Sequence, residues 1–473
     1  MVYSAQQLPL PGALHKRPMA KTPIAVAASL HDSEVAARAR RRIARRLLPF
    51  VFVLYIANYL DRANLAYAAL EMSHDLRLSD RVFGVGAGIF FIGYLGLQIP
   101  GALFVERWSA RKWLSTILIA WGALTALTSL VHGAHQLYAA RFFLGVAEAG
   151  FFPGVIVYLT HWFCYEDRAK AVANFMAAIP VSFIIGSPVA GALLGVHWLG
   201  IEGWRWLFIL EGIPAVLLGV LALFLLTDRP EDARWLPAEE RQWIAARLRE
   251  EARAKSETES LGVLQALRSL PVILLALVVL CEYSGFYAFI FWFPTMLKRL
   301  SQMSNLRVGL LGALPYIAAF FAMQVVGWNS DRTRERRWHA AATQFLAAAA
   351  LLVLMLHAPS LGWTVTLFTL AGIGMIAFLP PFWALPSSFL KGPAAAASIG
   401  FINALGSMGG FIGPYAIGYL RTSTGSFNSG LGYMALALLL GGLIVLFCRK
   451  EKKLRVLEPE NAMALPVGVQ DES

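Results

Sequence analysis

The chain has 473 residues, of which 58% are hydrophobic and only 15% charged, and its formal net charge is +12. A soluble protein carries about 25% charged residues, so the composition excludes an ordinary soluble domain and predicts a polytopic membrane protein. The three cysteines, Cys164, Cys281 and Cys448, lie in or beside apolar segments without metal-ligand spacing, and we interpret them as packing residues.

The first residues are rich in Pro and Ala and contain no long apolar run. We expect a disordered segment to about residue 37, within a cytoplasmic tail of residues 1–46. Twelve stretches that are long and apolar enough to cross a bilayer follow it. They are predicted at approximately 47–69, 83–105, 113–131, 137–161, 171–195, 204–226, 271–296, 308–328, 339–357, 363–388, 394–420 and 430–448.

Lys and Arg concentrate in every second connection, whereas the alternate connections 132–136 and 358–362 contain none. Basic connections remain on the cytoplasmic side of a membrane. The pattern therefore predicts that both termini are cytoplasmic, and it explains the positive net charge by topology instead of nucleic-acid binding. The basic segments are 38–46, 107–112, 168–170, 228–268, 332–337 and 449–453.

One long connection, residues 228–268, divides the predicted spans into two sets of six. Its sequence PAEERQWIAARLREEARA predicts a short amphipathic surface helix. We expect an N-terminal bundle at 47–227, a C-terminal bundle at 269–449 and a cytoplasmic tail at 450–473. An internal repeat supports the division, because the segment beginning at Ser79 recurs 225 residues later at Ser304. The predicted fold is all-α, with two pseudosymmetric six-helix bundles around a central site.

Three ionisable residues fall where hydrocarbon is expected: Arg62 in the first span, and Arg141 and Glu148 in the fourth. An ionised side chain at membrane depth costs several kcal/mol and commonly faces a water-filled cavity. Asn58 precedes Arg62 by one helical turn, and Arg141 lies nearly two turns from Glu148, so each pair shares a helix face. Two guanidinium groups beside a titratable carboxylate predict a site for an anion that travels with a proton. The alternatives are a static Arg141–Glu148 ion pair and an Arg62 that is neutralised by Asp61 or by an acid of another helix.

The segment PGALFVERWSARK at 100–112 resembles the loop 2–3 motif of the major facilitator superfamily. The segments YIANYLDRANL at 55–65, RFFLGVAEAG at 141–150, WRWLFILEGIP at 204–214 and GFINALG at 400–406 are similar to the anion:cation symporter family within it. In the superfamily, the acidic residue of the loop motif latches the outward-open state. The resemblance implies a latch formed by Glu106, Arg107, Arg111 and Lys112, with a degenerate second copy at Asp331 and Arg332.

Members of the family carry carboxylates such as tartrate, sugar acids and phthalate. The resemblance implies that Arg62 and Arg141 bind the substrate, that Glu148 carries the coupling proton with a contribution from Asp61, and that Asn403 contacts the substrate. The motif departs from the common pattern, since Glu106 replaces an aspartate and Ala102 and Ser109 replace glycines. We therefore expect a looser latch that keeps its charges.

Further candidates for the cavity wall are polar or aromatic residues of other spans. Tyr94 and Gln98 lie one turn apart in the second span, and the C-terminal bundle contributes Tyr287, Trp383 and Ser387. Glu282 lies near the middle of the seventh span, where an apolar residue is expected. It is a candidate second proton site or a contact for a donor group on the substrate; the alternative is a buried acid paired with a polar residue, with no role in transport.

The sequence thus predicts a proton-coupled symporter that imports a small organic anion (tartrate, a sugar acid or an aromatic carboxylate) across a bacterial inner membrane by alternating access. Its partners are the substrate and the lipid bilayer, with no nucleic acid, and we expect it to function as a monomer. We expect no cofactor besides the coupling proton, no metal and no enzymatic activity, and no G-x-x-x-x-G-K-[ST] motif for ATP occurs. The alternative is an exchanger or efflux carrier of the same superfamily with a non-anionic substrate.

Overall fold

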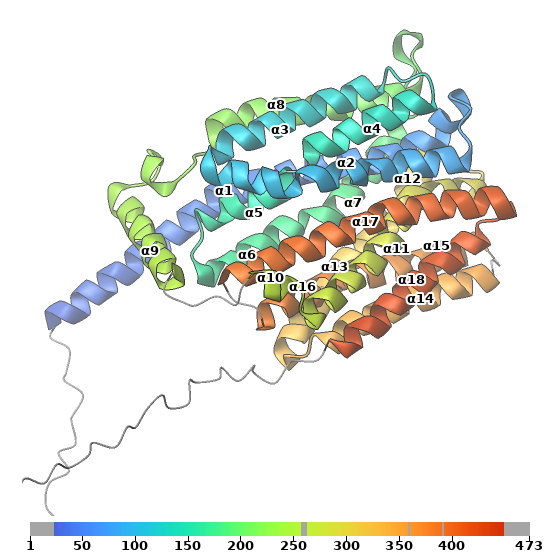
Figure 1. Cartoon of the computed structure of the whole chain (residues 1–473). Helices are drawn as coiled ribbons and strands as arrows, with labels where there is room; N and C mark the ends of the chain where they lie inside the picture. Colours follow the sequence, from blue (N-terminus) through green and yellow to red (C-terminus); the bar gives the residue numbers. More distant parts are fainter. Residues whose placement is uncertain (1–22, 257–262, 358–359, 390–391, 449–473) are drawn as a thin grey trace, which may run out of the picture.

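The computed structural model describes residues 23–256, 263–357, 360–389 and 392–448. In these ranges the regular elements are all helices, most of them running side by side (Figure 1), which confirms the all-α prediction. The first half contains α1 (Pro23–Asp75), α2 (Asp80–Arg107), α3 (Ala110–Thr128), α4 (Ala134–Glu148), α5 (Phe151–Thr160), α6 (Tyr165–Met176), α7 (Ala178–Leu193) and α8 (Gly203–Leu225). The connection contains α9 (Ala238–Ser256) and α10 (Val263–Leu267). The second half contains α11 (Leu270–Ser301), α12 (Asn305–Gly312), α13 (Leu314–Thr333), α14 (Arg337–Leu356), α15 (Leu361–Ala377), α16 (Leu379–Phe389), α17 (Gly392–Thr424) and α18 (Asn428–Phe447).

Ten helical segments of the described chain are long and apolar enough to cross a membrane. They coincide with ten of the twelve predicted spans, and α3 and α17 occupy the positions of the third and eleventh. The spans are therefore placed as the hydropathy of the sequence predicted. The protein is a multi-pass membrane protein.

Four of the predicted continuous spans are each divided into two helices, at the α4–α5, α6–α7, α12–α13 and α15–α16 junctions. A proline follows each junction: Pro153, Pro180, Pro315 and Pro381. Proline removes a backbone donor and clashes with the carbonyl four residues earlier, which interrupts a helix just before the ring. The interruptions thus have a local cause that hydropathy alone does not register.

The first helix begins at Pro23 and continues through the first span to Asp75. The expectation of a disordered segment to about residue 37 is therefore wrong for residues 23–37, whose Ala-rich sequence favours a helix. The amphipathic helix predicted in the long connection is confirmed as α9, which packs against α1 with Ile244 buried. Figure 1 shows α9 beside the part of α1 that extends beyond the bundle.

The two copies of the internal repeat begin their helices in the same way. Ser79 caps α2 by accepting a hydrogen bond from the Val82 N–H, and Ser304 caps α12 by accepting one from the Arg307 N–H. Gly84 and Gly309 occupy equivalent positions one turn later. A Cβ on Gly84 would lie 2.6 Å from the Pro414 carbonyl oxygen of α17, and one on Gly309 would lie 2.3 Å from the Ser187 carbonyl oxygen of α7. Each repeat thus presents a glycine for a close approach to the other half.

Polar contacts join the halves at the same end of the bundle. Asp80 of α2 forms ion pairs with Arg299 of α11, at 3.4 Å, and with Arg421 of α17. Asn305 of α12 donates a hydrogen bond of 2.6 Å to Glu71 of α1. This end is called the gated end below. The other end, which carries α9 and the arginine-rich start of α1, is called the basic end.

Candidate substrate and proton site

A buried ion pair joins α1 to α4. The Arg62 guanidinium of α1 donates through Nε to Glu148 Oε1 of α4 at 2.9 Å. Its Nη1 donates to the Tyr287 hydroxyl of α11 at 2.8 Å. All three residues are less than 9% exposed. One cation therefore contacts a titratable group of the first half and a hydroxyl of the second.

Aromatic rings surround this charge. The Arg62 guanidinium lies 5.0 Å from the Tyr59 ring centroid and 5.1 Å from that of Tyr94, within the range of cation–π attraction. The Arg141 guanidinium lies 4.9 Å from the Phe90 ring, and in the described structure its Nε and Nη2 are buried without a hydrogen-bond partner. Arg62 is thus engaged by a carboxylate, whereas Arg141 has donors left for one.

Asp61, the residue before Arg62, is bonded to another helix: its Oδ1 accepts a hydrogen bond from Thr125 Oγ1 of α3 at 2.7 Å. Its Oδ2, and Oε2 of Glu148, are buried without a hydrogen-bond partner among the described residues. Arg141 and Glu148 are both electrostatic neighbours of Asp61. The first half therefore gathers Asp61, Glu148 and two guanidinium groups in one buried cluster, and the carboxylate of Glu211 is a further electrostatic neighbour of Asp61. Each of the three carboxylates has at least one buried oxygen without a hydrogen-bond partner among the described residues.

A small cavity opens beside Arg62, with a volume of about 40 Å³. At about 10–15 Å³ for each water, it accommodates a few waters and no organic acid. Its aromatic wall in the first half consists of Tyr55, Tyr59, Phe91, Tyr94 and Phe152. Its aromatic wall in the second half consists of Tyr283, Phe286, Tyr287 and Trp383. Apolar Met176, Ile179 and Leu379 and polar Asn403 and Ser407 complete the lining. The described lining contains one ionisable cation, Arg62, and no acid.

A hydrogen-bonded chain crosses between the halves on the α17 side of this cavity. Gln98 of α2 donates to Ser407 Oγ at 3.1 Å and accepts from Asn403 Nδ2 at 3.1 Å. The Asn403 Oδ1 in turn accepts from the Tyr283 hydroxyl at 3.4 Å. Tyr283 and Tyr287 are one turn apart on α11. The Tyr283 hydroxyl bonds Asn403 and the Tyr287 hydroxyl bonds Arg62, so one helix contacts both groups.

The structure brings most of the residues that were predicted for the site to this region. Arg62, Tyr94, Tyr287, Trp383 and Asn403 line the cavity. Gln98 lies outside the lining and bonds its residue Asn403. The charged cluster beside Arg62 contains Glu148, Asp61 and Arg141. Asn58 is buried but does not line the cavity, and its Nδ2 has no hydrogen-bond partner in the described structure. Ser387 is in α16, but its side chain is outside the described residues.

Glu282 is separate from this group. It is buried on α11, and it accepts a hydrogen bond of 2.5 Å from Gln344 Nε2 of α14. Neither residue lines the cavity. Glu282 thus faces the α14 side of its helix, while Tyr283 and Tyr287 face the cavity.

The carboxylates predicted for the latch are engaged within their own halves. Glu106 pairs with His161 at 3.1 Å, and the Arg111 backbone N–H and the Ser109 hydroxyl both donate to Asp228 at 2.9 Å. The side chains of Arg107 and Lys112 lie at the same basic end, the second over Trp108 at 6.0 Å. Among the described residues, the Glu106 carboxylate therefore forms no ion pair with the second half.

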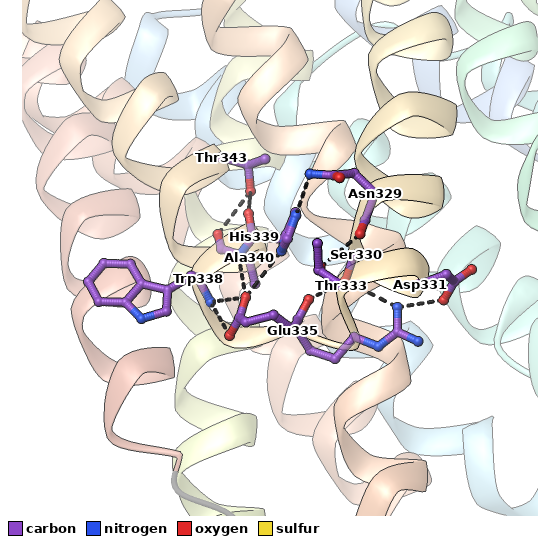
Figure 2. Close-up of polar contacts among 10 residues, drawn as sticks. Asn329, Ser330, Asp331, Thr333, Glu335, Trp338, His339, Ala340 and Thr343 are labelled. Carbon is purple, nitrogen blue, oxygen red and sulfur yellow. Dashed lines mark hydrogen bonds and ion pairs between the residues drawn. The ribbon is translucent and has the colours of Figure 1, made fainter.

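The second copy of the motif forms a compact polar turn between α13 and α14 (Figure 2). Asp331 pairs with Arg336 at 2.6 Å, and Arg332 lies 5.4 Å from the Trp328 ring. Burial disfavours the charge of Glu335, but the Trp338 and His339 backbone N–H groups and the His339 ring lower its pKa below the ordinary value. These contacts fix the start of α14 and do not reach the first half.

Sequence reasoning missed several residues that define the cavity. Tyr55 and Tyr59 precede Arg62 by about two turns and one turn, and Tyr283 precedes Tyr287 by one turn. The one-turn spacing from a predicted site residue is a signal that could have found Tyr59 and Tyr283. Thr125, which holds Asp61, carries no such signal, because its partner is on another helix.

Comparison with known proteins agrees with this architecture. Residues 51–414 match the Major Facilitator Superfamily, and the chain belongs to that family of membrane transport proteins, which are not enzymes. A "Putative tartrate transporter" of Agrobacterium vitis is 44% identical, over 88% of this chain and 95% of that protein.

Other bacterial relatives have different names. A "Putative metabolite transport protein NicT" of Pseudomonas putida is 37% identical, over 90% of this chain and 98% of that protein. A quinolone resistance transporter of Acinetobacter baumannii is 34% identical, over 87% of this chain and 96% of that protein. The chain is thus a transporter. It covers nearly the whole length of these relatives, whose names refer to different compounds.

A solved bacterial homologue of the human lysosomal transporter Spinster, in an inward-facing and unoccupied conformation, superimposes with a TM-score of 0.67. It is 17% identical and covers 87% of this chain and 95% of its own. At this identity the likeness concerns the fold alone, and it supports the major facilitator fold derived above.

Proposed function

We propose that the protein is a proton-coupled symporter that imports a small organic anion across a bacterial inner membrane. The observation that carries the proposal is the buried Arg62–Glu148 pair beside the cavity. A guanidinium fork suits a carboxylate, because it donates parallel hydrogen bonds. The carboxylate of Glu148 already occupies the fork that a substrate carboxylate would need.

This competition couples the substrate to a proton. When Glu148 takes up a proton it loses its charge, and its hold on Arg62 weakens. A substrate carboxylate then binds Arg62 more tightly, and by the reciprocity of linked equilibria it also makes protonation of Glu148 more favourable. Asp61 is the second proton acceptor in this proposal, since its free oxygen lies in the same cluster. Arg141, with its unpaired donors, is a second ligand for the same substrate carboxylate, and it becomes available when the cluster rearranges.

The contacts between the halves support alternating access as the transport mechanism. The ion pairs of Asp80 and the close approaches at Gly84 and Gly309 hold the gated end together. We place the basic end in the cytoplasm, because Lys and Arg are retained there. The structure then corresponds to a form that is closed toward the periplasm, and the latch of Glu106 is the contact that would form with the second half in the opposite form.

Names of relatives support two substrate directions. The name of the putative tartrate transporter favours an organic acid as the substrate, whereas that of the quinolone resistance transporter favours a carrier that confers drug resistance. The buried guanidinium in the cavity is the feature that favours an anion. A carrier of cations would place an acid in the lining, where the described residues have none.

Uptake by the purified protein in proteoliposomes tests the proposal. The interior is loaded at alkaline pH, and labelled tartrate, galactonate, phthalate and 4-hydroxybenzoate are added outside at acidic pH. We expect accumulation of at least one acid above its external concentration, and its loss when a protonophore collapses the gradient. Accumulation that survives the protonophore would remove proton coupling. If no acid enters and cationic or neutral compounds are transported instead, the exchanger or efflux alternative holds.

A further inference from the structure

The lining of the cavity narrows the class of substrate. Nine of its fifteen described residues are aromatic and three more are aliphatic or thioether side chains. Flat aromatic ligands gain both apolar burial and ring–ring contact from such a wall. A polyhydroxylated acid would need a partner for each of its hydroxyls. The wall offers tyrosine hydroxyls, Asn403 and Ser407, but the polar groups of Tyr283, Tyr287, Asn403 and Ser407 are already hydrogen-bonded within the protein, and each unpaired buried polar group is unfavourable.

The charge of the lining points the same way. Arg62 is the one cation among the described lining residues, and Arg141 lies against the Phe90 ring outside the lining. A second carboxylate on the ligand would therefore be buried without a cation, which is strongly unfavourable. The cavity is matched in charge to a ligand with one carboxylate.

Polar groups are available at a second point of the wall. Tyr287 bonds Arg62, and Tyr283, four residues earlier on α11, bonds Asn403. Four residues rise about 6 Å along a helix, close to the length of a benzene ring with one polar substituent at each end. Asn403 and Ser407 supply an amide and a hydroxyl there, and the Trp383 indole N–H is buried without a partner in the described structure.

We propose that the substrate is an aromatic monocarboxylate with a hydrogen-bonding group opposite its carboxylate: the carboxylate binds Arg62, the ring lies among the aromatic side chains of both halves, and the distal group binds at Tyr283, Asn403 and Trp383. This inference rests on the proposed function and specifies its substrate. Because the cavity holds only about 40 Å³ here, binding requires the two halves to separate, which displaces Tyr287 from Arg62.

The test compares acids that differ in one feature, using the full-length protein in proteoliposomes with the pH gradient described above. The probes are 4-hydroxybenzoate, benzoate, phthalate, galactonate and tartrate. We expect 4-hydroxybenzoate to accumulate, with a half-saturating concentration about fivefold below that of benzoate, as one additional hydrogen bond allows. Phthalate, galactonate and tartrate should compete at least tenfold more weakly.

Tyr283→Phe tests the distal contact within one variant. It should bring the half-saturating concentrations of 4-hydroxybenzoate and benzoate to within about twofold, a ratio that does not depend on how much protein folds. The control is Tyr316→Phe, since Tyr316 is also buried but stacks on Phe183 outside the lining. It should leave the ratio unchanged.

The two proposals fail differently. If tartrate or galactonate accumulates and 4-hydroxybenzoate neither accumulates nor competes, the aromatic class is wrong while proton-coupled anion uptake stands. An unchanged ratio in Tyr283→Phe would overturn the distal contact. If none of the five acids accumulates, the proposed function fails, and the substrate class fails with it.

Discussion

Arg62 and Glu148 form a buried ion pair between α1 and α4, and the same guanidinium reaches across to Tyr287 of α11. A change of charge at Glu148 therefore alters a contact between the two halves. Many transporters place their site at such an interface, where two bundles move relative to each other. In the proposed mechanism, proton uptake at Glu148 therefore acts directly on a contact between the two halves.

Glu148→Gln should separate exchange from accumulation. The amide keeps the shape of the side chain and cannot take up a proton, so the variant should exchange internal for external substrate at a rate within about tenfold of the native protein. It should lose gradient-driven accumulation completely. Counterflow and pH-driven uptake in the same proteoliposomes measure the two activities.

Glu282→Gln is the matched control for that variant, because Glu282 is another buried acid in an apolar helix but faces Gln344 away from the cavity. We expect accumulation within about twofold of native. If Glu282→Gln also abolishes accumulation while preserving exchange, Glu282 is the second proton site that the sequence left open. Full accumulation by Glu148→Gln would remove Glu148 from the coupling mechanism.

The close glycines at the gated end give a second prediction. An added Cβ at Gly84 or Gly309 would meet a backbone carbonyl of the other half at 2.6 or 2.3 Å, so the helices must separate. Overpacking of this kind costs about 1–3 kcal/mol. Gly84→Ala and Gly309→Ala should each destabilise the form that is closed at this end, lowering the transport rate by about tenfold or more.

Gly96→Ala serves as the control in the same helix as Gly84. A Cβ there would meet no atom within 4 Å, so transport should stay near the native rate. Uptake rates at equal protein content compare the three variants. Similar rates in Gly84→Ala and Gly96→Ala would mean that the close approach at Gly84 is not needed for transport.

Much of the architecture was accessible from the sequence because its causes are local. Spans follow from runs of apolar residues, and the repeat from Ser79 and Ser304 was visible as a pattern before both proved to be helix caps. The interruptions before Pro153, Pro180, Pro315 and Pro381 also have local causes, although the span predictions ignored them. The start of α1 was misplaced since a Pro- and Ala-rich composition suggested disorder, while its Ala-rich part favours a helix.

The residues that the structure gathers at the candidate site could be predicted as a set, but their contacts could not. Spacing placed Arg141 and Glu148 on one helix face, yet Glu148 bonds Arg62 of another helix. Likewise, Gln98 bonds Asn403, which lies 305 residues away. Such contacts depend on how helices pack, and one sequence gives helix faces without saying which faces meet. Buried charged residues indicate where the candidate site lies, but helix packing determines which side chains bond one another there.

Cys164 gives a prediction about pH outside the membrane spans. Burial raises the pKa of its thiol to about 11, with Glu251 adding to the shift. An exposed cysteine has a pKa of about 8.5, and the thiolate is the reactive form. At pH 7.5 alkylation of Cys164 should thus be slow, and its rate should rise about tenfold per pH unit to nearly pH 11. Mass spectrometry of the Cys164 peptide after timed labelling measures the rate. A plateau near pH 8.5 would show that the thiol is exposed.

The ion pairs of Asp80 give the last prediction. Asp80 connects α2 to Arg299 and Arg421 at the gated end, and its charge is the one shared by both pairs. Asp80→Asn removes that charge and should make the cavity more accessible from this end. Phe91 lines the cavity, so a Phe91→Cys background reports the change through labelling by a membrane-impermeant thiol reagent. We expect labelling from the periplasmic side to be about three- to tenfold faster with Asp80→Asn.

Asp232→Asn, a substitution in the connection near the basic end, should leave the labelling rate unchanged. Equal rates in both variants would show that the ion pairs of Asp80 do not hold this end closed, and faster labelling from the cytoplasmic side alone would reverse the orientation proposed for the protein.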